Sequence, residues 1–121
     1  MSGSDMTRSP AAQGRCDANQ SEIVKRYEDW FCSVVDLHSV GFGCPDLMVG
    51  IQGSTELVEV KTEEGRLSNA QQLFTETWRG SKPVIVRNIK DVDSHVMVVQ
   101  ARLRAQRMRH GSEAKEASEA T

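Results

Sequence analysis

Two apolar segments joined by a short turn constrain the fold of this chain more than any other feature of its sequence. Residues 46–51 form an apolar run that Gln52-Gly53-Ser54 closes, and residues 56–61 form a second run of strand character. A glycine-containing turn between two such runs is typical of a β-hairpin. The fold is therefore expected to contain a sheet with an antiparallel pair at this position.

The second strand of this predicted hairpin has charged and apolar residues in alternation. Side chains of an extended segment point to opposite faces in turn, so Glu59 and Lys61 share one face, while Val58 and Val60 share the other. The valines are expected in the core. The carboxylate and the ammonium group then lie side by side, roughly 7 Å apart along the strand, as an active-site arrangement or as a salt bridge.

Asp46 opens the partner strand, and Pro45 fixes the backbone just before it. Its carboxylate can therefore converge on Glu59 from the adjacent strand. Two carboxylates placed together need a cation, and with a backbone carbonyl such as that of Val60 they suit Mg²⁺ or Mn²⁺. Beside such an ion, Lys61 would orient or activate a water for phosphodiester hydrolysis. Taken singly, these charged residues also fit exposed strand positions and a turn cap.

The remaining periodicities predict an α/β fold. A capping-box pattern at Asn19 and Glu22 predicts a helix over residues 20–31, and a second such pattern at Ser68 and Gln71 predicts a helix that ends at Gly80. The other expected elements are strands at 33–38 and 84–86 and a last helix from Asp91, with Val92, Val96, Val99 and Leu103 on its inner face. Three meandering strands and a crossover helix leading to a fourth strand make a mixed sheet flanked by helices.

Length and composition favour one domain in a reducing compartment. The 121 residues suit a single domain, expected over 19–110, between a disordered leader at 1–18 and a disordered tail at 111–121. The three cysteines are odd in number and lack C-x-x-C spacing, which favours the cytosol. No apolar run reaches the roughly 20 residues of a membrane span.

The net charge of −2 conceals a strong asymmetry along the chain. Residues 1–78 contain 6 basic and 12 acidic side chains, whereas residues 79–110 contain 8 basic and 2 acidic ones. This split indicates a basic surface for a polyanion beside an acidic pocket for cations, or else a solvated basic helix. The basic residues expected to contact phosphates are Arg79, Lys82, Arg87, Lys90, Arg102, Arg104, Arg107 and Arg109, with Arg66 as a further candidate.

At these residues the sequence resembles the PD-(D/E)XK nuclease superfamily and, within it, the VRR-NUC family. The resemblance extends over residues 34–47, 57–61, 67–71, 78–80 and 84–87 and covers most of residues 22–93. It implies a restriction-endonuclease-like αβββαβ core with an extra C-terminal helix. It also implies that Asp46, Glu59 and the Val60 carbonyl bind metal and that Lys61 is catalytic.

Three further residues have competing interpretations. Gln71 matches the family's helix glutamine near the active site, and the capping box with Ser68 is an equally good explanation. Glu22 matches the acidic metal ligand that many members have on the first helix, although the capping box with Asn19 also explains it. His38 points near the expected cleft, but a hydrogen-bonded structural histidine fits as well.

The resemblance also implies a substrate and an assembly. Small stand-alone members of the family are dimers that cut branched DNA, so we expect a homodimeric, Mg²⁺- or Mn²⁺-dependent endonuclease acting on branched DNA such as Holliday junctions. It would work in the cytoplasm of a bacterial or phage-infected cell, without a membrane or an organic cofactor. The alternatives are a non-catalytic nucleic-acid-binding or scaffolding protein on the same fold, and a subunit that needs a partner.

Overall fold

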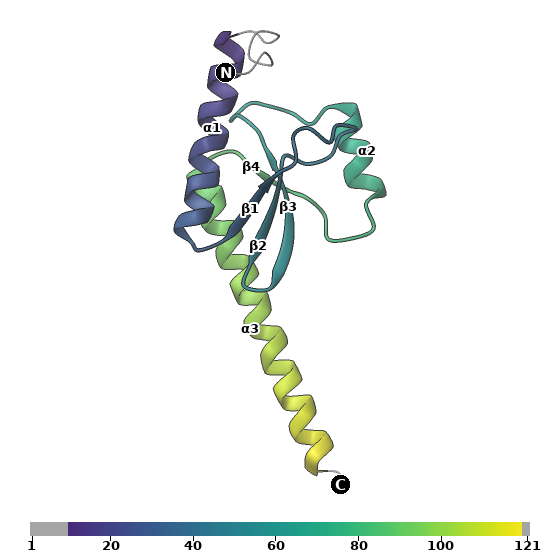
Figure 1. The fold of residues 1–121 in the computed structure, drawn as a ribbon. Helices are drawn as coiled ribbons and strands as arrows, with labels where there is room; N and C mark the ends of the chain where they lie inside the picture. The colour runs from purple at the N-terminus through teal and green to yellow at the C-terminus, as the bar shows by residue number, and fades with distance from the viewer. Residues whose placement is uncertain (1–9, 120–121) are drawn as a thin grey trace.

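The computed structural model describes residues 10–119 and shows three helices and four strands in these residues (Figure 1). Their order is helix, three strands, helix, strand and helix, which confirms the predicted αβββαβ core with an extra C-terminal helix. The elements are α1 (Pro10–Asp29), β1 (Ser33–Asp36), β2 (Leu47–Ile51), β3 (Ser54–Val60), α2 (Asn69–Thr77), β4 (Val84–Val86) and α3 (Ile89–Glu119).

The four strands form one mixed sheet in the order β1-β2-β3-β4. β1, β2 and β3 are antiparallel neighbours, whereas β4 pairs with β3 in parallel because α2 makes the crossover between them. The predicted hairpin is β2–β3, with Leu47 opposite Val58 and Ile51 opposite Ser54. Gln52 and Gly53 form its turn, and both have positive φ angles of 49° and 93°, the pattern of tight hairpin turns.

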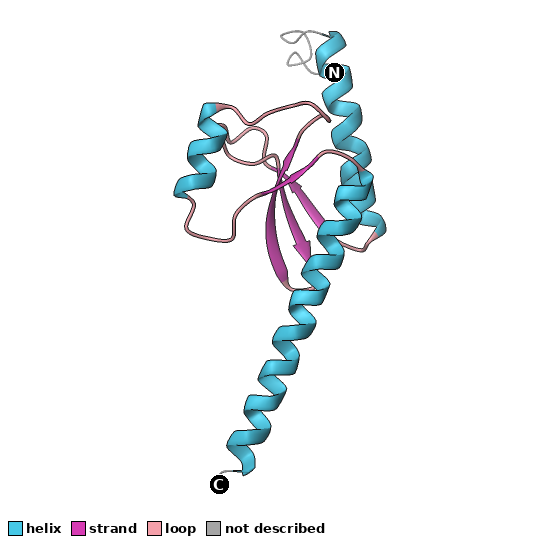
Figure 2. Cartoon of the chain, turned by 180° about the vertical axis from the view of Figure 1, so that it is seen from behind, coloured by secondary structure: helices cyan, strands magenta, loops and turns pink. Residues whose placement is uncertain are grey.

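The helices lie on both faces of the sheet (Figure 2). α1 and α3 contact each other and cover one face, where Ile23 and Tyr27 of α1 meet buried residues of β2, β3 and β4. The residues of α3 in this core are Val92, Val96 and Val99, with Leu103 packed against it, which confirms the predicted inner face. α2 lies over the opposite face and has no buried residue.

A chain of hydrogen bonds ties α1, α3 and β3 together within this core. The Tyr27 hydroxyl lies 2.7 Å from Nδ1 of His95, and Nε2 of that histidine lies 3.3 Å from Oε1 of Glu56. Arg102 donates to Oε2 of the same glutamate at 2.8 Å, and Ser54 donates to that oxygen as well. Burial opposes ionisation of Glu56, but these donors hold its pKa below the usual value.

A second link joins the two helices nearer the surface. Arg26 of α1 binds Asp93 of α3 through both carboxylate oxygens, at 2.7 and 2.9 Å. The indole of Trp30 donates to the same aspartate at 2.8 Å. Trp30 is therefore a structural residue of the α1–α3 contact.

The structure differs from the sequence prediction at the helix termini. α1 begins at Pro10 and α3 runs from Ile89 to Glu119, so the described parts of the predicted leader and tail are helical here. Residues 1–9, 120 and 121 lie outside the described residues. The predicted capping box at Asn19 was wrong, because that residue lies inside α1 and its side-chain amide donates to the Lys61 carbonyl instead, at 3.2 Å.

The predicted end of the second helix was also displaced. α2 ends at Thr77, and Trp78 is its C-cap in an extended conformation, so Gly80 lies beyond the helix. Across residues 10–119 none of the helices is both long and apolar enough to cross a membrane.

Candidate active site

The β2–β3 hairpin brings Asp46 and Glu59 together. Its register, continued by one residue beyond Leu47 and Val58, places Asp46 opposite Glu59. The backbone N–H of Val60 donates to Oδ2 of Asp46 at 2.8 Å, which holds the carboxylate against β3. The Asp46 carbonyl accepts a bond of 2.7 Å from the N–H of Leu37, so the start of β2 is fixed from both sides.

Glu59 is the buried member of the pair, with only 4% of its surface exposed. Its Oε2 accepts a hydrogen bond of 2.9 Å from Nε2 of Gln71 and lies 3.8 Å from the ammonium nitrogen of Lys61. Burial, followed by the neighbouring Asp46 carboxylate, raises the pKa of Glu59 to about 8, and Lys61 opposes this rise only in part. A buried carboxyl group next to a second carboxylate favours a proton or a cation.

Gln71 fulfils both of its predicted contacts. Its Oε1 accepts from the N–H of Ser68 at 2.8 Å, and the Ser68 hydroxyl accepts from the Gln71 N–H at 3.2 Å, which completes the capping box of α2. Its Nε2 is left to donate to Glu59. One side chain therefore caps the start of α2 and orients the Glu59 carboxylate.

The backbone around Lys61 is fixed by three other elements. Its N–H donates to the Val86 carbonyl of β4 at 3.1 Å, and its own carbonyl accepts from Asn19 of α1. The following turn is held by the guanidinium of Arg87, which donates to the carbonyls of Thr62, Glu63 and Gly65 at 2.7, 3.3 and 2.6 Å. These contacts position the lysine beside Glu59.

Gly43 allows the loop before Asp46 to close against α2. Its φ is +75°, and a Cβ at this position would overlap the backbone carbonyl of Ala70. The close approach leaves a cavity of about 30 Å³ between the loop and α2, which Gly43, Glu59 and Gln71 line together with residues of β4 and its approach. The glycine before the Pro-Asp pair therefore shapes the wall of the site.

Two predicted residues lie apart from this group. Glu22 is exposed on α1, where it lines a surface hollow with Asn88 and Lys90. No three His, Cys, Asp or Glu side chains within residues 10–119 are arranged to hold a metal together, so Glu22 does not join Asp46 and Glu59 here. His38 is exposed and bonds to Asp36 through both its backbone N–H and Nδ1 at 2.8 Å, as a hydrogen-bonded structural histidine would.

Four of the basic residues predicted to contact DNA, those between β3 and α3, fall into two groups. Arg87 holds the turn after Lys61, and the ammonium of Lys82 donates to the carbonyls of Thr75, Glu76 and Trp78 at the end of α2. Both are engaged within the fold. Arg66 and Arg79 are exposed, and these two retain the accessibility that a phosphate contact requires.

Asn19 and Arg87 hold the backbone at the candidate site in ways that the sequence patterns missed or misassigned. Asn19 acts on a carbonyl 42 residues away, and Arg87 acts on a turn more than 20 residues away. Neither contact leaves a local signal, because the partners are brought together by the tertiary fold and not by helical or strand periodicity.

The donors at this site fit a hard divalent cation. Two carboxylates from neighbouring strands lie side by side, and burial, followed by the Asp46 carboxylate, raises the pKa of Glu59. Carboxylate oxygens with a backbone carbonyl are the ligands that Mg²⁺ and Mn²⁺ prefer. The residues present therefore match the ion that the resemblance implied.

An αβββαβ fold with an acidic pair and a lysine on its central hairpin defines a nuclease of the PD-(D/E)XK type. A family model described as "VRR-NUC domain" matches residues 5–102, and the chain therefore belongs to the VRR-NUC family. A solved structure described as "VRR_NUC domain" is similar at 28% sequence identity and a TM-score of 0.58, covering 68% of this chain and 94% of that one. Among curated proteins there is no match.

Proposed function

We propose that this chain is a divalent-metal-dependent DNA endonuclease that cuts branched DNA, such as Holliday junctions, as a homodimer. The observation that carries the proposal is the convergence of Asp46 and Glu59 across the hairpin, with the Lys61 ammonium 3.8 Å from Glu59. A structural ion pair needs only one carboxylate. Two carboxylates and a lysine match the needs of phosphodiester hydrolysis.

Each side chain has a distinct part in this proposal. Asp46, Glu59 and the Val60 carbonyl would hold Mg²⁺ or Mn²⁺, which supplies neutralisation of phosphoryl charge and a water of lowered pKa. Lys61 presents its ammonium to the attacking water and the scissile phosphate. Gln71 keeps the Glu59 carboxylate in place through its Nε2–H.

DNA would be held mainly through its phosphates. The exposed guanidinium groups of Arg66 and Arg79 lie on the segments that flank α2. Such contacts give salt-sensitive binding with little sequence preference, so selectivity has to come from the shape of the DNA.

A two-fold dimer suits a branched substrate, because it presents two equivalent sites in a fixed relation. A four-way junction has paired scissile phosphates that match this arrangement. Exposed apolar side chains near the site, at Leu73, Trp78 and Ile85, offer a surface for the second copy. The cytoplasm of a bacterial or phage-infected cell is the proposed location.

The test is a cleavage panel of four-way junction, flap, single-stranded and linear duplex DNA with Mg²⁺ or Mn²⁺. We expect wild-type protein to cut branched DNA and both Asp46→Asn and Lys61→Ala to lose at least about 100-fold in rate. Lys25→Ala is the matched control, since Lys25 is exposed on α1 and pairs with Asp29 at 3.5 Å.

Two results would count against the proposal. Retained cleavage by Asp46→Asn or Lys61→Ala would remove these residues from the chemistry. DNA retention without cleavage on any substrate of the panel would instead favour a non-catalytic nucleic-acid-binding protein on the same fold.

A further inference from the structure

The turn at residues 41–44 has an unusual residue at its tip. Gly41, Phe42 and Gly43 have successive φ angles of 77°, 57° and 75°, and Cys44 N–H closes the turn on the Gly41 carbonyl at 3.0 Å. Positive φ at both central residues is the pattern of a type I′ turn, which Gly, Asn and Asp dominate. A phenylalanine there is sterically unfavourable, because its Cβ crowds the backbone in the left-handed region.

The side chain of Phe42 makes little contact with the rest of the fold, so packing does not compensate for its unfavourable backbone conformation. It is 95% exposed, so its ring lies in water and not in the core. Burial of an aromatic ring is one of the largest favourable terms available to a side chain. A ring held in this way is open to contact with a ligand, and its position in the fold decides which ligand can reach it.

The position of the turn relates this ring to the active site. Gly43, the next residue, packs against the Ala70 carbonyl and lines the cavity that Glu59 and Gln71 also line. Asp46 follows Phe42 by four residues. A DNA strand with a phosphate at Asp46, Glu59 and Lys61 therefore passes beside the turn.

We propose that the Phe42 ring stacks on an unpaired DNA base next to the scissile phosphate and so selects DNA with unstacked bases. This inference rests on the proposed nuclease function and adds a determinant of its substrate. Every base has a π-face, so stacking on an aromatic ring is tolerant of sequence. In an intact duplex both faces of each base are already stacked, and a free face occurs only at a flap, a gap or a branch.

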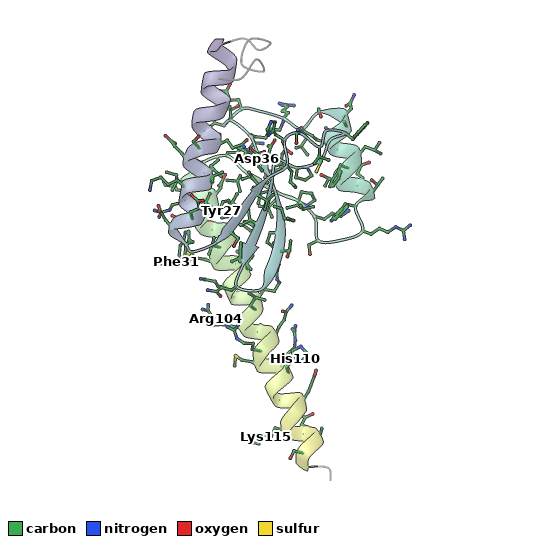
Figure 3. The ribbon with its side chains drawn as sticks, in the orientation of Figure 1. Tyr27, Phe31, Asp36, Arg104, His110 and Lys115 are labelled. Carbon is green, nitrogen blue, oxygen red and sulfur yellow. The ribbon has the colours of Figure 1, made fainter. Side chains whose placement is uncertain are left out.

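The chain contains its own control for this idea. Phe31 is 98% exposed and has a φ of 62°, so it shares the residue type, the backbone conformation and the exposure of Phe42. It precedes β1, whereas the turn at 41–44 follows β1. Figure 3 shows Phe31 and Asp36 near opposite ends of that strand, with Asp36 on the side of the active-site loops.

The experiment measures binding by the full-length chain in EDTA, so that no cleavage occurs. The probes are a duplex that carries a short single-stranded flap, with 2-aminopurine at the branch, and a fully paired duplex of the same length. We expect the wild type to prefer the flap and to quench 2-aminopurine fluorescence. Phe42→Ala is expected to weaken flap binding by roughly 5- to 150-fold, the effect of losing one base–aromatic stack, and to abolish quenching.

The controls separate stacking from other effects. Binding of the paired duplex stays at the wild-type level in Phe42→Ala, Phe42→Tyr restores flap binding and quenching, and Phe31→Ala behaves as wild type on both probes. The melting temperature of Phe42→Ala also stays at the wild-type value, because the ring makes little contact with the fold.

Several outcomes overturn the proposal. The first is that the wild type binds both probes equally or binds neither. The second is that Phe42→Ala keeps its preference for the flap. The third is that Phe31→Ala loses flap binding and quenching as Phe42→Ala is expected to. A changed oligomeric state in Phe42→Ala with an unchanged flap preference would assign the ring to a contact with a second copy. Failure of the nuclease function is read separately, as absence of cleavage by the wild type when Mg²⁺ or Mn²⁺ is added.

Discussion

Strand β3 carries two buried glutamates whose carboxyl groups have opposite environments. Glu56 faces α1 and α3 and accepts hydrogen bonds from Ser54, Arg102 and His95, so its pKa is lowered although burial opposes this. Glu59 faces α2 and is buried next to Asp46, which raises its pKa to about 8. The same residue type therefore stabilises the fold on one face and opposes it on the other.

Above pH 4.5, we expect the free energy of unfolding to fall as the pH rises, because of the Glu59 carboxyl group. The unfolded chain ionises this group near 4.5, whereas the folded chain keeps its proton up to about pH 8. Because the folded state then binds more protons, the contribution of Glu59 is fully present below pH 4.5 and is lost as the pH rises to 8. Urea unfolding between pH 5 and 9 without metal measures this fall, and added Mg²⁺ should reverse part of it at pH 8.

Two glutamine variants provide the matched control. At pH 8, Glu59→Gln removes a carboxylate that the fold disfavours and should raise the free energy of unfolding by about 1–2 kcal/mol, while cleavage is lost. Glu56→Gln breaks the ion pair with Arg102 and should lower the free energy of unfolding by about 1–3 kcal/mol. Equal effects of the two substitutions would contradict the assigned environments.

The arrangement of Asp46, Glu59 and Lys61 was the most predictable part of the molecule. Strand alternation alone put Glu59 and Lys61 on one face, and hairpin pairing put Asp46 beside them. The contacts of Asn19 and Arg87 escaped prediction, because each side chain bonds to backbone far away in the chain. Charge alone suggested a phosphate contact for Arg87, and only its three carbonyl partners show its structural role.

At the level of elements, the corner between β4 and α3 supports the active site from behind. Arg87 directly follows β4 and holds the turn after Lys61, and its own N–H donates to Asp91 in the first turn of α3 at 2.8 Å. Asn88 donates to the Glu63 carboxylate at 2.7 Å and also accepts from the Asp91 N–H at 2.9 Å. The start of α3 is thereby joined to the strand that carries the lysine.

Arg87→Ala should therefore slow cleavage without weakening DNA binding. We expect a drop in kcat of about tenfold from a misplaced lysine, with KM near the wild-type value. Arg79→Ala is the counterpart, since an exposed phosphate contact changes affinity and reduces the salt dependence of log K by about 1. Steady-state kinetics and binding at several salt concentrations separate the two, and a purely KM-type defect in Arg87→Ala would contradict its positioning role.

The ends of the elements were harder to predict than their existence. All seven elements were expected in the right order, because amphipathic spacing reports which face of a helix or strand is buried. The start of α1 was misplaced because Asn19 and Glu22 have capping-box spacing, whereas the amide of Asn19 has a tertiary acceptor at Lys61. Tertiary hydrogen bonds compete with local capping, and the sequence does not reveal which one prevails.

At the scale of the whole molecule, a row of buried hydrogen bonds between side chains joins α1, α3 and β3. Tyr27 of α1, His95 of α3 and Glu56 of β3 meet on the face of the sheet away from the active site. Burial is the main cause that raises the pKa of Tyr27, so its hydroxyl stays protonated. The connection fixes how α1 and α3 sit on the sheet.

Tyr27→Phe should lower the free energy of unfolding by about 1–2 kcal/mol, because it leaves a buried imidazole nitrogen without its partner. Cleavage by the folded variant should be unchanged, since the hydroxyl lies on the far face. Chemical denaturation gives the first quantity and initial rates below the unfolding transition give the second. A wild-type stability would show that the hydroxyl is not needed.

The proposed homodimer has its own test. Leu73 and Ile85 are exposed apolar residues on α2 and β4, whereas Met108 is an exposed apolar residue on α3, beyond Leu103, which still packs against the core. We expect Leu73→Asp to shift the protein to a monomer in light scattering and to reduce junction cutting more than nicking of single sites. Met108→Asp should keep the assembly mass of the wild type. A monomeric Met108→Asp together with a dimeric Leu73→Asp would instead assign the interface to α3.

The attachment of α2 has a consequence for motion. This helix has no buried residue, and among its described contacts are the Gly43 approach, the Gln71 bond to Glu59 and the Lys82 bonds at its C-terminus. Elements with so little buried surface open by local unfolding at a small fraction of the global free energy. Amides of α2 should therefore exchange with solvent deuterium long before those of β3. The candidate site then has one rigid wall and one wall that fluctuates, and a bound DNA strand should slow this exchange by ordering the second wall.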